Sequence, residues 1–162
     1  IALLNRKGYQ INSGQIKKAL AAVVFPGRFE IFLENPVVLI DGAHNSNGIQ
    51  ALVKNMKQYF PNRTINLFFG MREDKDIEES LSYLVPIAST IHTLTPNSDR
   101  AMPAEKMAAL IHNTYGKSVD FYDTMEAAIN SIDLSQKDEV NVFVGSLYMI
   151  GEARTLIRKN LL

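Results

Sequence analysis

The chain has 162 residues, with 17 basic and 17 acidic side chains and no cysteine. A chain of this length forms one ordinary domain. Its zero formal net charge argues against general binding to nucleic acids or membrane surfaces, because both attractions need a basic excess. The lack of cysteine excludes disulfides, thiolate zinc sites and a cysteine nucleophile, and it fits a reducing, cytoplasmic compartment.

The start of the chain has neither an initial methionine nor the pattern of a signal peptide. The first residue is Ile1 rather than Met, and residues 1–10 lack the apolar core of a signal peptide. No stretch approaches the ~20 apolar residues that cross a bilayer. We therefore expect a fragment of a longer protein, with residues 1–22 as a linker and lead-in helix and residues 23–162 as the folded domain.

The first strand pattern follows the lead-in helix. Phe29, Ile31 and Leu33 alternate with polar residues, which is the period of a strand that buries one face. A tight turn then leads to residues 37–40, which are apolar throughout. Two strands joined so closely form a hairpin, so we expect one antiparallel strand at the edge of the sheet.

Beyond this hairpin, helical and strand periods alternate without interruption. Further strands are expected at residues 64–70, 89–95, 118–122 and 139–145. Helices are expected at residues 14–24, 49–60, 77–84, 103–116, 125–132 and 147–161. Because parallel strands need crossover connections, this order predicts an α/β fold with a mostly parallel sheet and helices on both faces.

Polar residues stand at the carboxyl ends of the predicted strands, where ligands of open α/β sheets bind. Asp41 ends a buried strand, where it either accepts hydrogen bonds from sugar hydroxyls or caps the following helix. His44 either orients a substrate carboxylate or amine, or is an ordinary surface or cap-bonded histidine. Arg28 either binds phosphate or is a solvated charge. Because Arg28 precedes the antiparallel strand, we expect Arg28, Asp41 and His44 on one rim.

Two later residues are further candidates. Lys75 either binds a substrate carboxylate or belongs to a solvated charge run in which Asp74 or Asp76 caps the next helix. Ser146 opens the last helix, where we expect it both to cap the helix and to contact a substrate, since the N–H groups there attract anions. The histidines do not have the spacing of metal ligands, so no metal site is expected in this chain.

Several phosphate-binding and catalytic motifs are absent. The sequence has no G-x-x-x-x-G-K-[ST] loop and no G-x-G-x-x-G after a strand, so neither a P-loop nor a nicotinamide cofactor is expected. The serine-hydrolase elbow G-x-S-x-G is also absent, because Tyr148 holds the place of its second glycine.

Five sequence blocks together carry a resemblance to a known family: FPGRFEIF, VVLIDGAHNSNG, FFGMREDKD, TPNSDRAMPAE and VFVGSLYMIGEAR. From about Ile11 onward the chain resembles the C-terminal domain of folylpolyglutamate synthase/dihydrofolate synthase, the glutamate-ligase domain shared with the Mur ligases. The resemblance implies a Rossmann-like sheet of about six strands with one antiparallel strand. It also implies part of a cytoplasmic, ATP-dependent ligase that adds L-glutamate to a folate through an acyl phosphate.

The same resemblance implies roles for the candidate residues. Arg28 would contact the ATP phosphates, and Asp41 would bind the ATP ribose. His44 would be catalytic and would lie near the acyl phosphate or the incoming glutamate. Lys75 and Ser146 would face the glutamate carboxylates.

The N-terminal ATPase domain of that family, with its P-loop, its magnesium ligands and most folate contacts, has no counterpart in this chain. We therefore expect the chain alone to be inactive. Its parent would be a monomer whose partners are ATP, magnesium, L-glutamate, and folate or dihydropteroate. Two alternatives remain: the C-terminal half of another Mur-type amino-acid ligase, or a non-catalytic nucleotide-binding or interaction domain. The second would leave Arg28, Asp41, His44 and Ser146 scattered.

Overall fold

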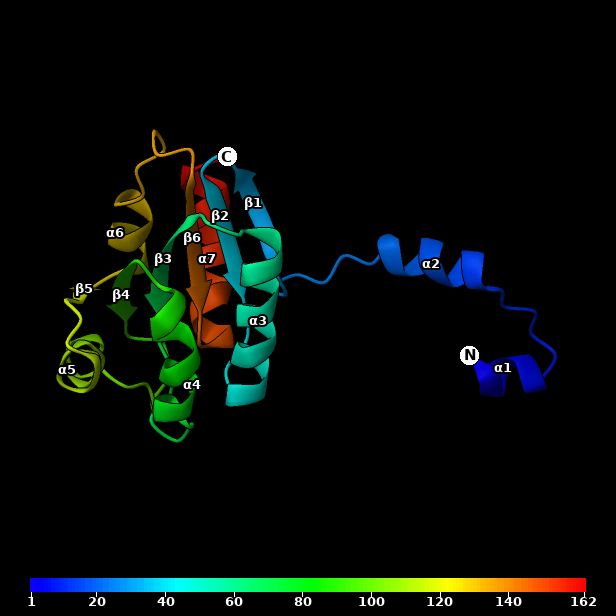
Figure 1. Ribbon diagram of the computed structural model, residues 1–162, viewed down its shortest axis with the longest axis horizontal. Coiled ribbons are helices and arrows are strands. Elements are labelled where there is room, and N and C mark those ends of the chain that lie inside the picture. The colour runs from blue at the N-terminus through cyan, green and yellow to red at the C-terminus, as the bar shows by residue number, and fades with distance from the viewer.

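A six-stranded sheet with the order β1-β2-β6-β3-β4-β5 forms the centre of the computed structural model, which describes residues 1–162 (Figure 1). Its strands are β1 (Glu30–Glu34), β2 (Val37–Asp41), β3 (Thr64–Phe69), β4 (Thr90–Leu94), β5 (Asp120–Tyr122) and β6 (Glu139–Val144). The β1–β2 pair is antiparallel, and all other neighbours pair in parallel. The predicted α/β sheet with one antiparallel edge strand is confirmed.

Helices cover both faces of the sheet, as predicted (Figure 1). The covering helices are α3 (Ser46–Tyr59), α4 (Ile77–Leu84), α5 (Ala104–Tyr115), α6 (Met125–Asn130) and α7 (Leu147–Asn160), with a 3₁₀ turn η1 (Val85–Ile87). Two further helices, α1 (Ala2–Arg6) and α2 (Ser13–Ala21), precede the sheet. Helices α3, α4 and α5 contribute to one apolar cluster, and α6 and α7 contribute to the other. None of these helices is long and apolar enough to cross a membrane.

Strand β2 supplies both layers of the core, because successive side chains of a strand point to opposite faces. Val37 and Leu39 belong to the apolar cluster that also contains side chains of α3, α4 and α5. Val38 and Ile40 belong to the cluster that also contains side chains of α6 and α7. All four are at most 2% exposed, and burying each one stabilises the fold by about 1.5–3 kcal/mol. The apolar run is therefore buried on both faces, as predicted, and contributes to both layers of the core. Asp41 follows directly after it.

The predicted alternation of β1 is wrong in detail. The pairing with β2 shifts between Ile31 and Leu33, so Phe32 is an extra residue in the ladder. A bulge of this kind resets which side chains face the core. Ile31 is consequently 43% exposed, whereas Phe32 and Leu33 both pack against the α7 side of the core.

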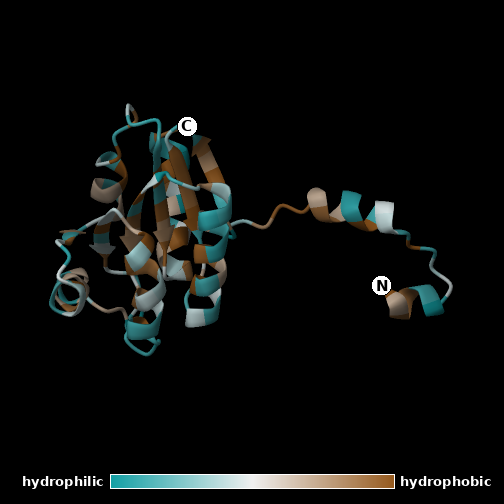
Figure 2. Cartoon of the chain, in the orientation of Figure 1, coloured by the Kyte–Doolittle hydropathy of each residue, from teal (hydrophilic) through white to brown (hydrophobic).

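The first two helices form an arm that projects from the domain (Figure 1). Asn12 and Gln15 form a reciprocal capping box at the start of α2, which confirms the predicted helix start. Neither α1 nor α2 has a buried residue. The connection to the sheet is apolar (Figure 2) and exposed, with Val24 at 84% and Phe25 at 65%.

Candidate functional site

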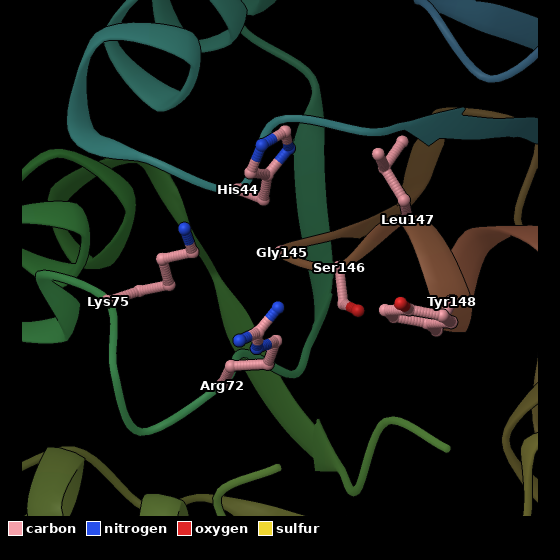
Figure 3. A pocket seen from close by; sticks show the side chains of 7 residues that line it. All are labelled: His44, Arg72, Lys75, Gly145, Ser146, Leu147 and Tyr148. Carbon is pink, nitrogen blue, oxygen red and sulfur yellow. The ribbon is translucent and has the colours of Figure 1, made fainter. Parts of the chain in front are cut away.

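Two adjoining cavities lie at the carboxyl ends of β2, β3 and β6. The α7 cavity, of about 490 Å³, is lined by His44, Arg72, Lys75, Gly145, Ser146, Leu147 and Tyr148 (Figure 3). The α3 cavity, of about 420 Å³, includes among its lining residues Arg28, Phe29, Asp41, His44, Asn45 and Asn55. His44 lines both cavities. The expected convergence of Arg28, Asp41 and His44 on one rim is found.

Asp41 joins two loops of the α3 cavity. Its Oδ2 accepts a hydrogen bond from the Phe29 N–H at 2.8 Å, and its Oδ1 accepts one from the Ala43 N–H at 2.8 Å. The alternative that Asp41 caps the next helix is wrong, because the Asn45 side chain caps α3 by accepting from the Gly48 N–H. Each Asp41 oxygen has a second lone pair, so the carboxylate remains able to accept a ligand hydroxyl.

Arg28 lies against Gly42, the residue that follows β2. The Gly42 N–H donates to the Gly27 carbonyl at 2.7 Å, which docks the PGR loop onto the residues after β2. A Cβ at position 42 would collide with the Arg28 guanidinium and the Leu147 side chain. Glycine at position 42 allows this close approach, since a larger residue would displace the ends of these side chains, and Arg28 is exposed at the rim.

Glu30 anchors the same loop and was not identified from the sequence. Its Oε2 accepts from the Gly27 N–H at 2.7 Å, and both its oxygens lie 3.0–3.1 Å from Arg154 Nε. Burial acts to raise the pKa of Glu30, but the bonds from Arg154 and Gly27, together with the charges of Arg154 and Arg158, overcome it. The net pKa of Glu30 is lowered, so the carboxylate is charged near neutral pH and ties β1 to α7.

His44 has a defined tautomer. Its Nδ1 lies 2.8 Å from the Gly42 carbonyl oxygen, and a carbonyl only accepts, so Nδ1 carries a proton. In the neutral ring, Nε2 therefore has a free lone pair. Nε2 has no hydrogen-bond partner within the chain, and His44 is half-buried between the two cavities. The ring can accept a hydrogen bond from a ligand amine.

Lys75 and Arg72 both extend into the α7 cavity (Figure 3). Lys75 is half-buried and has no ion-pair partner in the chain. Of the two predicted caps, Asp76 caps α4 by accepting from the Glu79 N–H. Asp74 instead bonds Arg72 Nη2 at 2.7 Å. Arg72 was not singled out from the sequence, although it lies just beyond the end of β3, at the sheet edge where Asp41 ends β2.

Ser146 holds the N-cap position of α7 but makes no side-chain cap bond. The capping part of the prediction for Ser146 is therefore wrong. The residue is 3% exposed, and its Oγ has no hydrogen-bond partner. The preceding Gly145 has a φ of 117°, and a Cβ there would collide with the Gly70 carbonyl. Glycine at position 145 thus allows the turn that presents Ser146 to the cavity.

The α7 cavity suits an anion. Arg72 and Lys75 bring positive charge to it, and no acidic residue lines it. Leaving a buried polar group such as the Ser146 hydroxyl unpaired costs about 1–3 kcal/mol. A ligand with acceptor oxygens removes that cost. No group of three or more His, Asp or Glu side chains gathers as a metal site.

Comparison with known proteins places the chain in a family. The family described as "Mur ligase, glutamate ligase domain" matches residues 27–147, which is most of the chain. The chain belongs to this family. The matched residues include Arg28, Asp41, His44 and Lys75 and end one residue beyond Ser146.

Curated relatives of this glutamate ligase domain are folate enzymes. The dihydrofolate synthase/folylpolyglutamate synthase of Bacillus subtilis is 30% identical over 151 residues, covering 91% of this chain and 34% of the relative. The folylpolyglutamate synthase of Lacticaseibacillus casei is 31% identical over 140 residues, covering 86% of this chain and 31% of the relative. The domain therefore spans about a third of the length of these relatives.

A solved structure shares the fold. The Mycobacterium tuberculosis folylpolyglutamate synthase complexed with ADP and AMPPCP is 28% identical, with a TM-score of 0.81 over 92% of this chain and 36% of that one. The glutamate ligase domain thus has the Rossmann-like architecture implied by its sequence blocks. The alternative of scattered site residues does not hold, because Arg28, Asp41, His44 and Ser146 line two cavities that share His44.

Proposed function

We propose that this glutamate ligase domain is the C-terminal part of an ATP-dependent ligase that adds L-glutamate to a folate through an acyl phosphate. The observation that carries the proposal is the position of His44 between two cavities. One cavity has the groups that suit a nucleotide, and the other has the groups that suit an amino-acid carboxylate. The names of the curated relatives, folylpolyglutamate and dihydrofolate synthases, support the choice of substrates.

The α3 cavity is proposed to receive ATP. Arg28 is exposed and without an ion-pair partner, so its guanidinium is available to the phosphates. Asp41 keeps free lone pairs for the ribose hydroxyls while its amide bonds fix its orientation. The ADP and AMPPCP bound to the M. tuberculosis relative support a nucleotide as the ligand.

The α7 cavity is proposed to receive L-glutamate. Lys75 faces one carboxylate, and the Ser146 hydroxyl donates to a carboxylate oxygen. His44 Nε2 accepts a hydrogen bond from the glutamate amine and orients its lone pair toward the activated folate carbonyl. The amine then attacks that carbonyl carbon, the bond from the carbon to the phosphate oxygen breaks, and the proton lost by the amine passes to His44 Nε2 as inorganic phosphate leaves. Since His44 lines both cavities, it stands where the two substrates have to meet.

The remaining parts of the site are proposed to lie in a preceding ATPase domain. Residues 1–22 serve as the linker to it, and residues 23–162 as the ligase domain proper. The preceding domain supplies the P-loop, the magnesium ligands and most folate contacts, and both domains close around the substrates in a cytoplasmic monomer. Magnesium neutralises phosphate charge when it is bound there. This domain alone is therefore expected to be inactive.

The test uses the complete ligase that contains this domain, assayed for ATP-dependent incorporation of labelled L-glutamate into reduced folate and dihydropteroate. We expect Arg28→Gln to raise the ATP KM about tenfold and to leave thermal stability unchanged. We expect His44→Ala to lower kcat about 100-fold. A wild-type enzyme that joins a different amino acid to a different acceptor would assign the domain to another Mur-type ligase instead.

A further inference from the structure

Three buried side-chain atoms in the chain have no hydrogen-bond partner: Arg72 Nε, His92 Nδ1 and Ser146 Oγ. Two of the three belong to residues that line the α7 cavity. Buried polar groups are almost always hydrogen-bonded, so unpaired ones call for a physical reason. Their concentration at one cavity indicates that a ligand with acceptor oxygens completes their bonds.

The same wall of the cavity has a second source of donors. Ser146 is the N-cap of α7, a helix of 14 residues, and its side chain makes no bond to the helix. The first N–H groups of a helix have no acceptor within it, and the helix dipole favours a negative charge there. The first two residues of α7, Leu147 and Tyr148, line the cavity as well. An anion at this wall meets the hydroxyl, these helix N–H groups and the Arg72 side chain.

We propose that Arg72 and Ser146 bind one carboxylate of the incoming amino acid and that Lys75 binds the other. This inference rests on the proposed function, in which the α7 cavity receives L-glutamate. The planar guanidinium of Arg72 matches a carboxylate with two parallel N–H donors, whereas Lys75 offers a compact charge. A dicarboxylate satisfies both cations. Glutamine leaves one of them without a charged partner, so Arg72 and Lys75 together select for glutamate.

Both the side chain of Arg72 and the backbone next to it are held by hydrogen bonds. Asp74 accepts from Arg72 Nη2 at 2.7 Å and from Arg100 Nη1 at 3.2 Å, so one carboxylate is shared between two guanidinium groups. The Met102 N–H donates to the Met71 carbonyl at 3.0 Å, which fixes the backbone beside Arg72 to the loop after β4. Asp74 occupies Nη2 and leaves Nε unpaired. The side chain is thus oriented while it keeps donors and charge for a ligand.

The test measures steady-state kinetics of Arg72→Gln in the complete ligase. We expect the L-glutamate KM to rise about 10-fold to 100-fold, because a charge-assisted pair is lost. The ATP KM is expected to stay unchanged, and the preference for L-glutamate over L-glutamine is expected to fall. Ser146→Ala, a smaller change, is expected to raise the same KM. Lys106→Gln is the control, because Lys106 pairs with Glu73 at 2.8 Å and does not line the cavity.

The outcomes separate the two proposals. A wild-type enzyme that adds no glutamate refutes the proposed function. A wild-type enzyme that does so, while Arg72→Gln shows the wild-type glutamate KM and the wild-type preference over glutamine, refutes only the role of Arg72. Circular dichroism and thermal unfolding establish that each variant is folded. If Arg72→Gln does not fold, Arg72→Lys replaces it in the test, because lysine keeps the charge and removes the two parallel N–H donors of the guanidinium. An unchanged L-glutamate KM in Arg72→Lys likewise refutes the role of Arg72.

Discussion

At the scale of single residues, one carboxylate both fixes two loops and lines the proposed nucleotide site. Asp41 fixes the Phe29 and Ala43 amides. Phe29 has a φ of 45°, which is uncommon for a residue with a side chain and is strained. The bond from its N–H to Asp41 helps to hold that conformation. Changes at Asp41 are therefore expected to affect stability as well as nucleotide binding.

Asp41→Asn tests this double role. An amide group offers one acceptor oxygen where the carboxylate offers two, so one of the two backbone N–H bonds is lost. We expect the free energy of unfolding to fall by about 1–2 kcal/mol, measured by urea denaturation of the 162-residue chain. Asn55→Ala is the matched change in the same cavity, since Asn55 makes no side-chain bond within the chain. Equal stability of Asp41→Asn and wild type would contradict the anchoring role.

Glu30 makes stability depend on pH. Its pKa is lowered below the ordinary value of 4.5, so its contribution is fully present above pH 4.5 and is lost as the pH falls through the folded pKa. We expect Glu30→Gln to be about 1–3 kcal/mol less stable than wild type at pH 7. The difference is expected to be smaller at pH 3 than at pH 7, because below pH 4.5 the unfolded chain binds a proton at Glu30 more readily than the folded chain does. Urea denaturation at both pH values measures it.

The control for Glu30 lies on the same strand. Glu34 is exposed at the end of β1 and has no ion-pair partner. Glu34→Gln is therefore expected to follow the wild-type pH dependence. A Glu30→Gln variant with the same stability difference at pH 7 and pH 3 would show that the ion pair with Arg154 does not stabilise the fold.

At the scale of elements, the site depends on how strands end. Gly145 follows β6, with a φ of 117° and no room for a Cβ beside the Gly70 carbonyl. Both residues stand at the ends of the two central parallel strands, β3 and β6. Glycine at position 145 allows this close backbone approach one residue before Ser146, the N-cap of α7.

Gly145→Ala is accordingly expected to destabilise the chain by about 1–3 kcal/mol, seen as a lower Tm. Gly151 provides the opposite case within α7, because a Cβ there meets nothing within 4 Å. Gly151→Ala is expected to stabilise the chain by about 0.5–1 kcal/mol, since alanine is the better helix former. If both substitutions shift the Tm in the same direction, the packing argument for Gly145 is wrong.

Much of the fold and part of the site could be predicted from the sequence. The strand and helix order was readable because hydrophobic periods are long and distinct. Arg28, Asp41, His44, Lys75 and Ser146 were found because strand ends and motifs point to them, and their roles remain predictions. The bulge in β1 was missed because pairing with β2, not the local pattern, sets its register.

Residues that act through distant contacts were harder to find. Arg72 stands in a run of charges, and its position depends on Asp74, Arg100 and the pairing of two loops. Glu30 looks like an ordinary outward-facing strand residue until Arg154, far along the chain, is placed beside it. Periodicity within one segment holds no information about such pairs.

At the scale of the whole molecule, the arm and the domain are independent. Helices α1 and α2 bury no residue against the sheet. Removing residues 1–21 is therefore expected to leave the Tm of the rest unchanged within about 1 °C, because little apolar surface is re-exposed. Differential scanning calorimetry of residues 22–162 and of the full chain measures this. A marked drop in Tm would show that the arm packs on the domain.

The arm joins the domain at the loop that contains Gly27 and Arg28. Phe25 and Pro26 lead directly into Gly27 and Arg28, and Gly27 is bonded on one side to Gly42 and on the other to Glu30. These two bonds anchor the loop through which the arm joins the sheet. Because Arg28 follows Gly27 directly, a change in the direction in which the arm leaves the domain is expected to move the guanidinium at the rim of the α3 cavity.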